Sequence, residues 1–267
     1  VGGTGGEAFH IDGVAAAPVW SPDGKWIAFV KAPMRDTDGD GTPDKRDDRE
    51  GWIAPDALSR TLDAKRFDGR VVTSTRYKSN GTLTWMPHYS TRDVPQLFVV
   101  PATGGQAVQV TRLAYAPSQV EWLADSETLV FTGDDQQDNE LNADLTADLF
   151  AVSRAGGEPR RLTMNPGAER SAAVSPRGDR IAFLQQRAVG AEVDLLVVEV
   201  TPDGQLRGAP RNLTTSWDRV PGEPRWTADG RALRFDAEIN GNAHVFEVPV
   251  EERGQVRAIT SGDVTIK

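Results

Sequence analysis

The chain contains no cysteine among its 267 residues, which excludes disulfide bonds, thiolate nucleophiles and cysteine-ligated metal centres. The same absence leaves the cellular compartment undetermined, because proteins without cysteine occur in reducing and oxidising compartments alike. No stretch of about 18 consecutive apolar residues occurs either, and a membrane-spanning helix needs that length, so we expect no membrane span.

Positive charge is in the minority: 30 Lys and Arg stand against 39 Asp and Glu, for a net charge of −9. Such a balance argues against a nucleic-acid backbone or an anionic membrane surface as the main partner. It fits a solvated acidic surface that keeps the protein soluble.

Catalytic signatures are missing as well. The chain has no Gly-x-Ser-x-Gly elbow, no phosphate-binding loop and no dinucleotide fingerprint. Its three histidines, His10, His88 and His244, stand in turn or strand patterns without a partnered serine and acid. By its own residues the chain is predicted to be a scaffold or a binding module.

A repeated turn is what the sequence does contain. The run Trp-Ser-Pro-Asp-Gly at 20–24 has Pro and Gly where a tight turn needs them, and an apolar strand pattern follows at 26–30. Related runs begin at Trp122, Val174 and Trp226, and the steps from 122 to 174 and from 174 to 226 are both 52 residues. In every copy two large apolar residues follow at the same phase, which predicts equivalent, buried strand positions: Ile27 and Phe29, Leu129 and Phe131, Ile181 and Phe183, Leu233 and Phe235.

A second hairpin pattern lies between these turns. In each copy an apolar strand is followed by a Gly-containing turn and a more polar strand that ends in Thr, and the polar strand should lie at a sheet edge. Two hairpins per repeat make a four-stranded antiparallel sheet, and a radial array of such sheets is a β-propeller. We therefore predict an all-β chain that divides as follows: the end of a preceding blade (1–11), an expanded blade with an insertion (12–111), three regular blades (112–163, 164–214 and 215–260) and the start of a next blade (261–267).

The insertion of the expanded blade contains an Asp-rich stretch at 36–48. Counted from Asp36, acidic residues fall in the order of a calcium loop, with Gly at the sixth position. No amphipathic helices flank it, so it is no EF-hand; it resembles the Asp-rich loops of thrombospondin type-3 or dockerin repeats. The alternative is a solvated acidic insertion interleaved with basic residues. The predicted Ca²⁺ ligands are Asp36, Asp38, Asp40, Thr42 through its carbonyl, and Asp47.

A second acidic stretch, 133–140, joins the two hairpins of the next blade. A solvated loop explains it, because loops are polar in general. Its functional interpretation is an acidic anchor for an ammonium group, with Glu140 as the candidate residue.

These motifs resemble the propeller repeats of two groups: the periplasmic propeller of the Tol system, and the N-terminal propeller of the prolyl oligopeptidase family of serine peptidases. The expanded blade favours the peptidases, especially their acylaminoacyl-peptidase and dipeptidyl-peptidase branches. The runs that carry this resemblance are 20–24, 27–29, 76–81, 96–100, 104–105, 110–111, 138–142 and 148–150.

The resemblance implies a seven-bladed propeller that caps a C-terminal α/β-hydrolase domain holding Ser, Asp and His. The propeller would admit short peptides and exclude folded proteins, and Glu140 would hold the free amino terminus of a substrate. No catalytic residue is assigned within 1–267, and the calcium-like loop departs from the family pattern. The alternatives are a stand-alone Tol-type propeller that binds proteins, and a propeller fused to a metal-dependent amidohydrolase.

Overall fold

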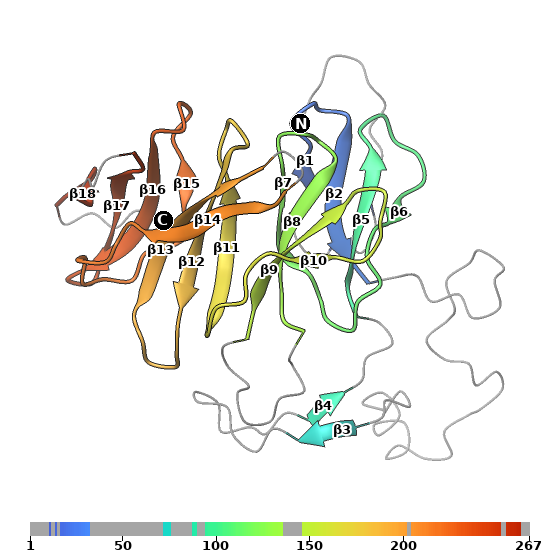
Figure 1. Ribbon diagram of the computed structural model, residues 1–267, viewed down its shortest axis with the longest axis horizontal. Helices are drawn as coiled ribbons and strands as arrows, with labels where there is room; N and C mark the ends of the chain where they lie inside the picture. The colour runs from blue at the N-terminus through green and yellow to red at the C-terminus, as the bar shows by residue number, and fades with distance from the viewer. Residues whose placement is uncertain are drawn as a thin grey trace, which may run out of the picture. The chain divides into compact units, whose positions relative to one another are not determined.

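The computed structural model describes residues 11, 14, 17–32, 94–135, 146–201, 204–251 and 255–262, together with the backbone of two strands at 72–75 and 87–89 (Figure 1). The chain forms two compact units, 1–31 with 95–267, and 32–94. In the second unit, β3 (Val72–Thr75) pairs antiparallel with β4 (Pro87–Tyr89).

The described residues of the first unit form four antiparallel sheets of four strands each, which confirms the predicted all-β propeller blades. In each blade the strands lie side by side in chain order, so the fourth strand is at the edge, as expected. The first blade is β1 (Val19–Trp20), β2 (Trp26–Lys31), β5 (Gln96–Pro101) and β6 (Val108–Gln109). The second is β7 (Ser118–Trp122), β8 (Thr128–Gly133), β9 (Asp148–Ser153) and β10 (Arg160–Arg161). The third is β11 (Ala168–Val174), β12 (Arg180–Gln186), β13 (Val193–Val200) and β14 (Leu206–Asn212). The fourth is β15 (Arg225–Trp226), β16 (Ala232–Ile239), β17 (Asn242–Pro249) and β18 (Arg257–Ala258).

The repeated turn joins the first and second strands of each blade. In the first copy the Ser21 hydroxyl donates to Asp23 Oδ1 (2.6 Å) and accepts the Trp26 N–H (3.0 Å). Gly24 takes the corner with φ of 71°, a conformation that other residues rarely adopt. Ser126 occupies the equivalent corner of the second blade with φ of 56°, and its hydroxyl accepts the Asp23 N–H of the first blade (3.1 Å).

The predicted phase of the apolar positions is confirmed. Ile27, Leu129, Ile181 and Leu233 lie on the second strands of their blades, and each is at most 6% exposed. Alternate residues of these strands point to opposite faces of a sheet, so the second and third blades each pack against a neighbour on either side. Three clusters of the core therefore lie between blades and join the first to the second, the second to the third and the third to the fourth. A fourth cluster, with Ile27 and Phe29, covers the other face of the first blade.

A threonine closes every blade. It stands two residues after the fourth strand, and its hydroxyl accepts the amide N–H of the third strand at 2.9–3.0 Å. In the first blade this hydroxyl also donates to Gln96 Oε1 (2.9 Å). The four pairs of amide and hydroxyl are Leu97 with Thr111, Leu149 with Thr163, Leu195 with Thr214, and Val245 with Thr260.

The far face of the fourth blade differs from the others. Where the second strand of the third blade has Ala182 and Leu184, β16 has exposed Arg234 and Asp236. Glu247 of β17 is buried on this face and accepts hydrogen bonds from Arg234 Nε (2.9 Å) and from Arg257. This blade therefore packs on the third blade through apolar residues and presents ion pairs on its other side.

Candidate functional site

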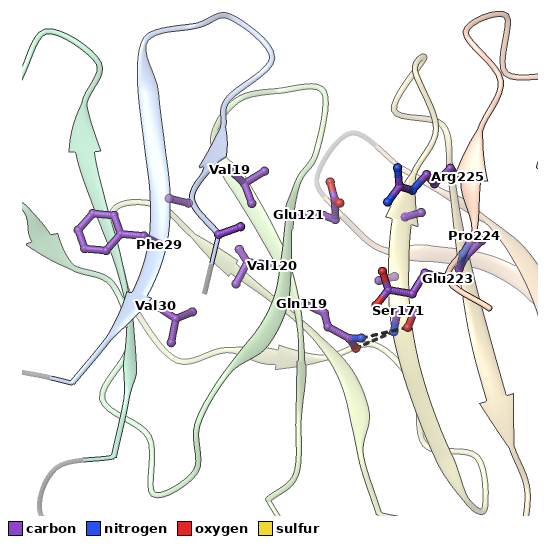
Figure 2. Close-up of a pocket in the computed structure, with 14 residues that line it drawn as sticks. Val19, Phe29, Val30, Gln119, Val120, Glu121, Ser171, Glu223, Pro224 and Arg225 are labelled. Atoms are coloured by element: carbon purple, nitrogen blue, oxygen red, sulfur yellow. Dashed lines mark hydrogen bonds between the residues drawn. The ribbon is translucent and has the colours of Figure 1, made fainter. Parts of the chain in front are cut away.

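The first strands of the four blades form one wall. β1 contacts β7, β7 contacts β11, and β11 contacts β15. A cavity of about 570 Å³ runs along this wall and is drawn in Figure 2. It is the candidate functional site, because it is concave and combines apolar walls with a few polar groups.

The repeat explains which side chains reach the cavity. Residues 52 positions apart occupy the same level of the wall. Each blade therefore lines the cavity with the residues that stand just before its repeated turn. One level holds Gln119, Ser171 and Glu223, and another holds Glu121, Ala173 and Arg225. Apolar side chains complete the lining: Ala17, Val19, Ala28, Phe29, Val30, Val120, Ala172 and Pro224.

Glu121 is the least expected residue of the wall. Burial raises the pKa of its carboxyl from 4.5 to about 7. Among the described residues none hydrogen-bonds or ion-pairs with this carboxyl. Arg225 lies at the same level on the other side of β11, as Figure 2 shows. The cavity thus presents an acid that changes charge near neutral pH and a permanent cation.

Hydrogen bonds fix the wall between the second and third blades. Gln119 Nε2 donates to Ser171 Oγ (3.0 Å), and its Oε1 accepts the Ser171 N–H (2.7 Å) and the Thr132 hydroxyl (3.1 Å). Gln119 and Ser171 both have positive φ, of 50° and 56°. Register shifts at these points bulge β7 and β11, and bulges re-aim side chains.

Two indoles fix the other joints. Trp122 Nε1 donates to the Val19 carbonyl (3.0 Å), and Trp226 Nε1 donates to the Ala173 carbonyl (2.9 Å). Each bond runs from the end of one first strand to the first strand of the preceding blade. The third blade has Val174 at this position, and there the Gln119 and Ser171 bonds supply the link.

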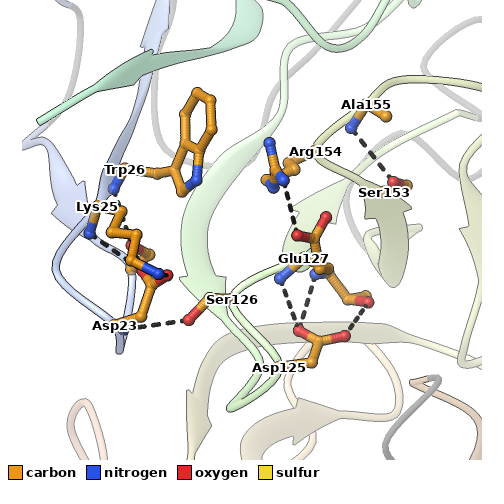
Figure 3. A network of polar contacts seen from close by, with 11 residues as sticks. Asp23, Lys25, Trp26, Asp125, Ser126, Glu127, Ser153, Arg154 and Ala155 are labelled. Atoms are coloured by element: carbon orange, nitrogen blue, oxygen red, sulfur yellow. Dashed lines mark hydrogen bonds and ion pairs between the residues drawn. The ribbon is translucent and has the colours of Figure 1, made fainter. Parts of the chain in front are cut away.

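A polar network surrounds the turns of the first two blades (Figure 3). Asp125 accepts the N–H groups of residues 127 and 128, and Glu127 pairs with Arg154 (2.7 Å). The Arg154 guanidinium lies over the Trp26 ring, 4.2 Å from its centroid. This network joins the blades at the surface and contains no group aimed into the cavity.

The residues predicted from the sequence lie elsewhere in the chain. Glu140 and the five predicted calcium ligands, Asp36, Asp38, Asp40, Thr42 and Asp47, fall outside the residues that the structure describes. Sequence reasoning did not single out Glu121, Gln119 or Arg225. The signal that could have found them is their position just before the repeated turn, at the same distance from it in each blade. These positions lie on the first strand of a blade, which contacts the first strand of the next blade.

Within the described ranges, no group of three or more His, Asp or Glu side chains could hold a metal ion. The same ranges contain no helix that is long and apolar enough to cross a membrane.

Sequence comparison finds relatives over part of the chain, although no family model matches it. It is 36% identical over 95 residues to dipeptidyl-peptidase 5 of Trichophyton schoenleinii, and to the protein of that name from Arthroderma benhamiae. The match covers 36% of this chain and 13% of each relative. The chain therefore matches only a small part of the length of these peptidases.

The structural neighbours are β-propellers. Acylaminoacyl peptidase of Pyrococcus horikoshii superposes with a TM-score of 0.54 and 13% identity over 95% of this chain and 33% of that one. A protein of Agrobacterium tumefaciens described as TolB gives 0.51 and 18% over 91% of this chain and 79% of that one. At such identities the likeness concerns the fold alone.

Proposed function

We propose that residues 1–267 are the propeller portion of a serine peptidase of the prolyl oligopeptidase family, which cleaves short peptides as a dipeptidyl- or acylaminoacyl-peptidase. The observation that carries this proposal is the 36% identity with dipeptidyl-peptidase 5 over 95 residues. The propeller fold shared with acylaminoacyl peptidase is consistent with it. The propeller would belong to a ring of seven blades that caps a C-terminal α/β-hydrolase domain.

In this proposal the cavity along the first strands of the blades, the first-strand cavity, lies on the path of the peptide substrate. The catalytic groups lie outside 1–267. Hydrolysis in such enzymes needs a serine, a histidine that activates it and an acid that orients the histidine. The propeller portion would contribute selection by size and charge.

The test compares the full-length protein with residues 1–267 alone, on chromogenic dipeptidyl and acylaminoacyl substrates. Full-length protein should release product, the isolated portion should not, and an active-site serine reagent should label only residues beyond 267. Turnover by the isolated portion would contradict the proposal. Absence of hydrolysis by an intact, folded full-length protein would favour the second candidate, a binding propeller of the kind that the TolB likeness suggests.

Two acids are candidates for holding the amino terminus of a substrate. Glu140 is proposed from the sequence, and Glu121 is proposed because its carboxyl is unpaired among the described residues of the cavity wall. Replacing the correct acid by Gln should raise KM for free-amine peptides roughly tenfold, since a hydrogen bond to a charged group contributes about 1.5–3 kcal/mol. Acylated peptides, which lack the ammonium ion, serve as the control. Equal responses of both substrate classes would remove that residue from the substrate site.

We also propose that Asp36, Asp38, Asp40, Thr42 and Asp47 ligate one Ca²⁺ through oxygen atoms at about 2.3–2.6 Å. Calorimetry should detect calcium binding to the wild-type protein and a much weaker signal with Asp40→Ala, which removes a central ligand. If wild type and variant both show no heat, the stretch is a solvated acidic insertion.

A further inference from the structure

Two acidic side chains meet inside the joint between the second and third blades, away from the first-strand cavity. Glu169 of β11 is fully buried, and Asp148 at the start of β9 is 4% exposed. The Glu169 N–H donates to the carbonyl of Ala147 (2.7 Å), the residue next to Asp148. This backbone bond holds the two carboxyl groups at the same point of the joint.

The hydrogen bonds around the pair are complete except at one atom. Glu169 Oε1 accepts from Gln185 Nε2 (2.7 Å) and from Asn165 Nδ2 (3.2 Å). Asp148 accepts from the Thr163 hydroxyl at Oδ1 (3.2 Å) and pairs with Arg161 through Oδ2 (3.1 Å). Glu169 Oε2 is buried and receives no donor from the described side chains or backbone. A buried oxygen left in this way is costly unless a proton is supplied.

The charges around the pair do not balance either. Arg161 is the cation that contacts Asp148, and it is shared with Asp135. Burial, and then the hydrogen bond and charge of Glu169, raise the pKa of Asp148 from 3.8 to about 7. The other charged or titratable groups facing the cluster are Asp134, Tyr115 and Arg187, the last through Gln185.

The repeat shows that this arrangement is particular to one joint. Glu169 replaces the proline found 52 residues before and after it, Pro117 and Pro221. Asp148 has an equivalent, Asp194, that accepts from Thr214 in the same way (3.3 Å). Asp194 has Pro221 in place of an opposing acid.

We propose that Asp148 and Glu169 hold one proton between them, so that a carboxylic acid–carboxylate hydrogen bond joins the second and third blades and is lost when the medium becomes alkaline. One proton satisfies Glu169 Oε2 and leaves the pair with a single negative charge, which lies next to Arg161. When the proton leaves, two carboxylates face each other in a buried site and repel. The two carboxyl groups bind and release this proton as a unit. The joint between the blades is therefore more stable in mildly acidic than in alkaline medium.

The sign of the effect follows from proton binding. The folded chain retains a proton that the unfolded chain has already released, so unfolding becomes easier as pH rises from about 4 to about 7. Urea unfolding of residues 1–267 should therefore show a midpoint that falls across this range. All measurements are made with Glu121→Gln present, because Glu121 titrates in the same range.

In that background Asp148→Asn should flatten the dependence, because the Asn amide donates to Glu169 Oε2 at every pH. Asp194→Asn, the matched control, should keep the slope. An unchanged slope in Asp148→Asn, or equal flattening in both variants, would overturn the proposal.

A second measurement does not depend on the variants folding. Infrared spectra of the folded protein at about pH 6, well above the pKa of an ordinary Asp or Glu, should contain the band of a protonated carboxyl group. In the Glu121→Gln background, which removes the band that Glu121 itself would give, Glu169→Gln should remove this band and Asp194→Asn should leave it. If the folded Glu121→Gln protein shows no protonated carboxyl group at this pH, the shared proton is wrong.

Discussion

At the residue scale, the closing threonine is the simplest determinant of a blade. The Thr111 hydroxyl accepts the Leu97 N–H and donates to Gln96, and the side chain is 1% exposed. Thr111→Val keeps the shape and leaves a buried N–H without an acceptor, which should cost about 1–3 kcal/mol of unfolding free energy. Urea unfolding measures this loss. Thr111→Ser restores the hydroxyl and should recover most of it; a loss in Thr111→Ser with none in Thr111→Val would mean that the methyl group, not the hydroxyl, is what matters.

Glu121 gives a prediction about pH at the same scale. Its folded pKa of about 7 lies above its ordinary value of 4.5, so the folded protein is stabilised by protonation of this group and loses that contribution as pH rises toward 7. Glu121→Gln should remove on the order of 3 kcal/mol of pH dependence, the equivalent of this shift. Stability measured from about pH 4 to about pH 8 tests the effect, and an unchanged dependence would show that the carboxyl is solvated in solution.

At the element scale, the ion pairs on the far face of the fourth blade change the stability of the protein with pH in the direction opposite to that of Glu121. Hydrogen bonds from Arg257 and Arg234 lower the pKa of Glu247. A lowered pKa contributes stability above the ordinary value of 4.5, and that contribution is lost as pH falls through the folded pKa.

Glu247→Gln should therefore destabilise the protein at neutral pH by about 1 kcal/mol, since both arginines are more than half exposed and salt screens them. The difference between variant and wild type should shrink in strong acid and in high salt. Thermal unfolding across pH and salt concentration measures it. A loss that is the same at every pH would indicate a packing effect in place of an electrostatic one.

The elements also show how far sequence reasoning reached. The four blades were predictable because large apolar residues, such as Phe29 and Phe131, keep the same phase after each turn. The cavity was not, because its lining comes from positions that are far apart in the chain and polar in only some copies, such as Gln119 and Arg225. The Asp148 and Glu169 pair needs contact across a joint, and its only trace in the sequence is an acid where the neighbouring repeats have proline.

At the scale of the whole molecule, the seven-bladed ring and the limits of the predicted blades stay predictions. The four described blades are held together by three joints of two kinds: an indole bond at the first and third joints, and the Gln119 bonds with the Asp148 and Glu169 pair at the second. The middle joint uses residues that the two indole joints lack. The side chains at the joints therefore specify the order of the blades. Exchanging two blades would place Glu169 opposite a blade that lacks Asp148.

The chain order of the strands has a consequence for synthesis on the ribosome. The second, third and fourth blades are each completed by strands that follow one another in sequence, so each can fold soon after its last strand leaves the exit tunnel. Until the next blade emerges, its apolar face is open to other nascent chains. After the fourth blade, the newest face carries Arg234, Asp236 and Glu238 in place of apolar residues. A nascent chain that has emerged as far as the fourth blade should therefore have little tendency to aggregate through this face.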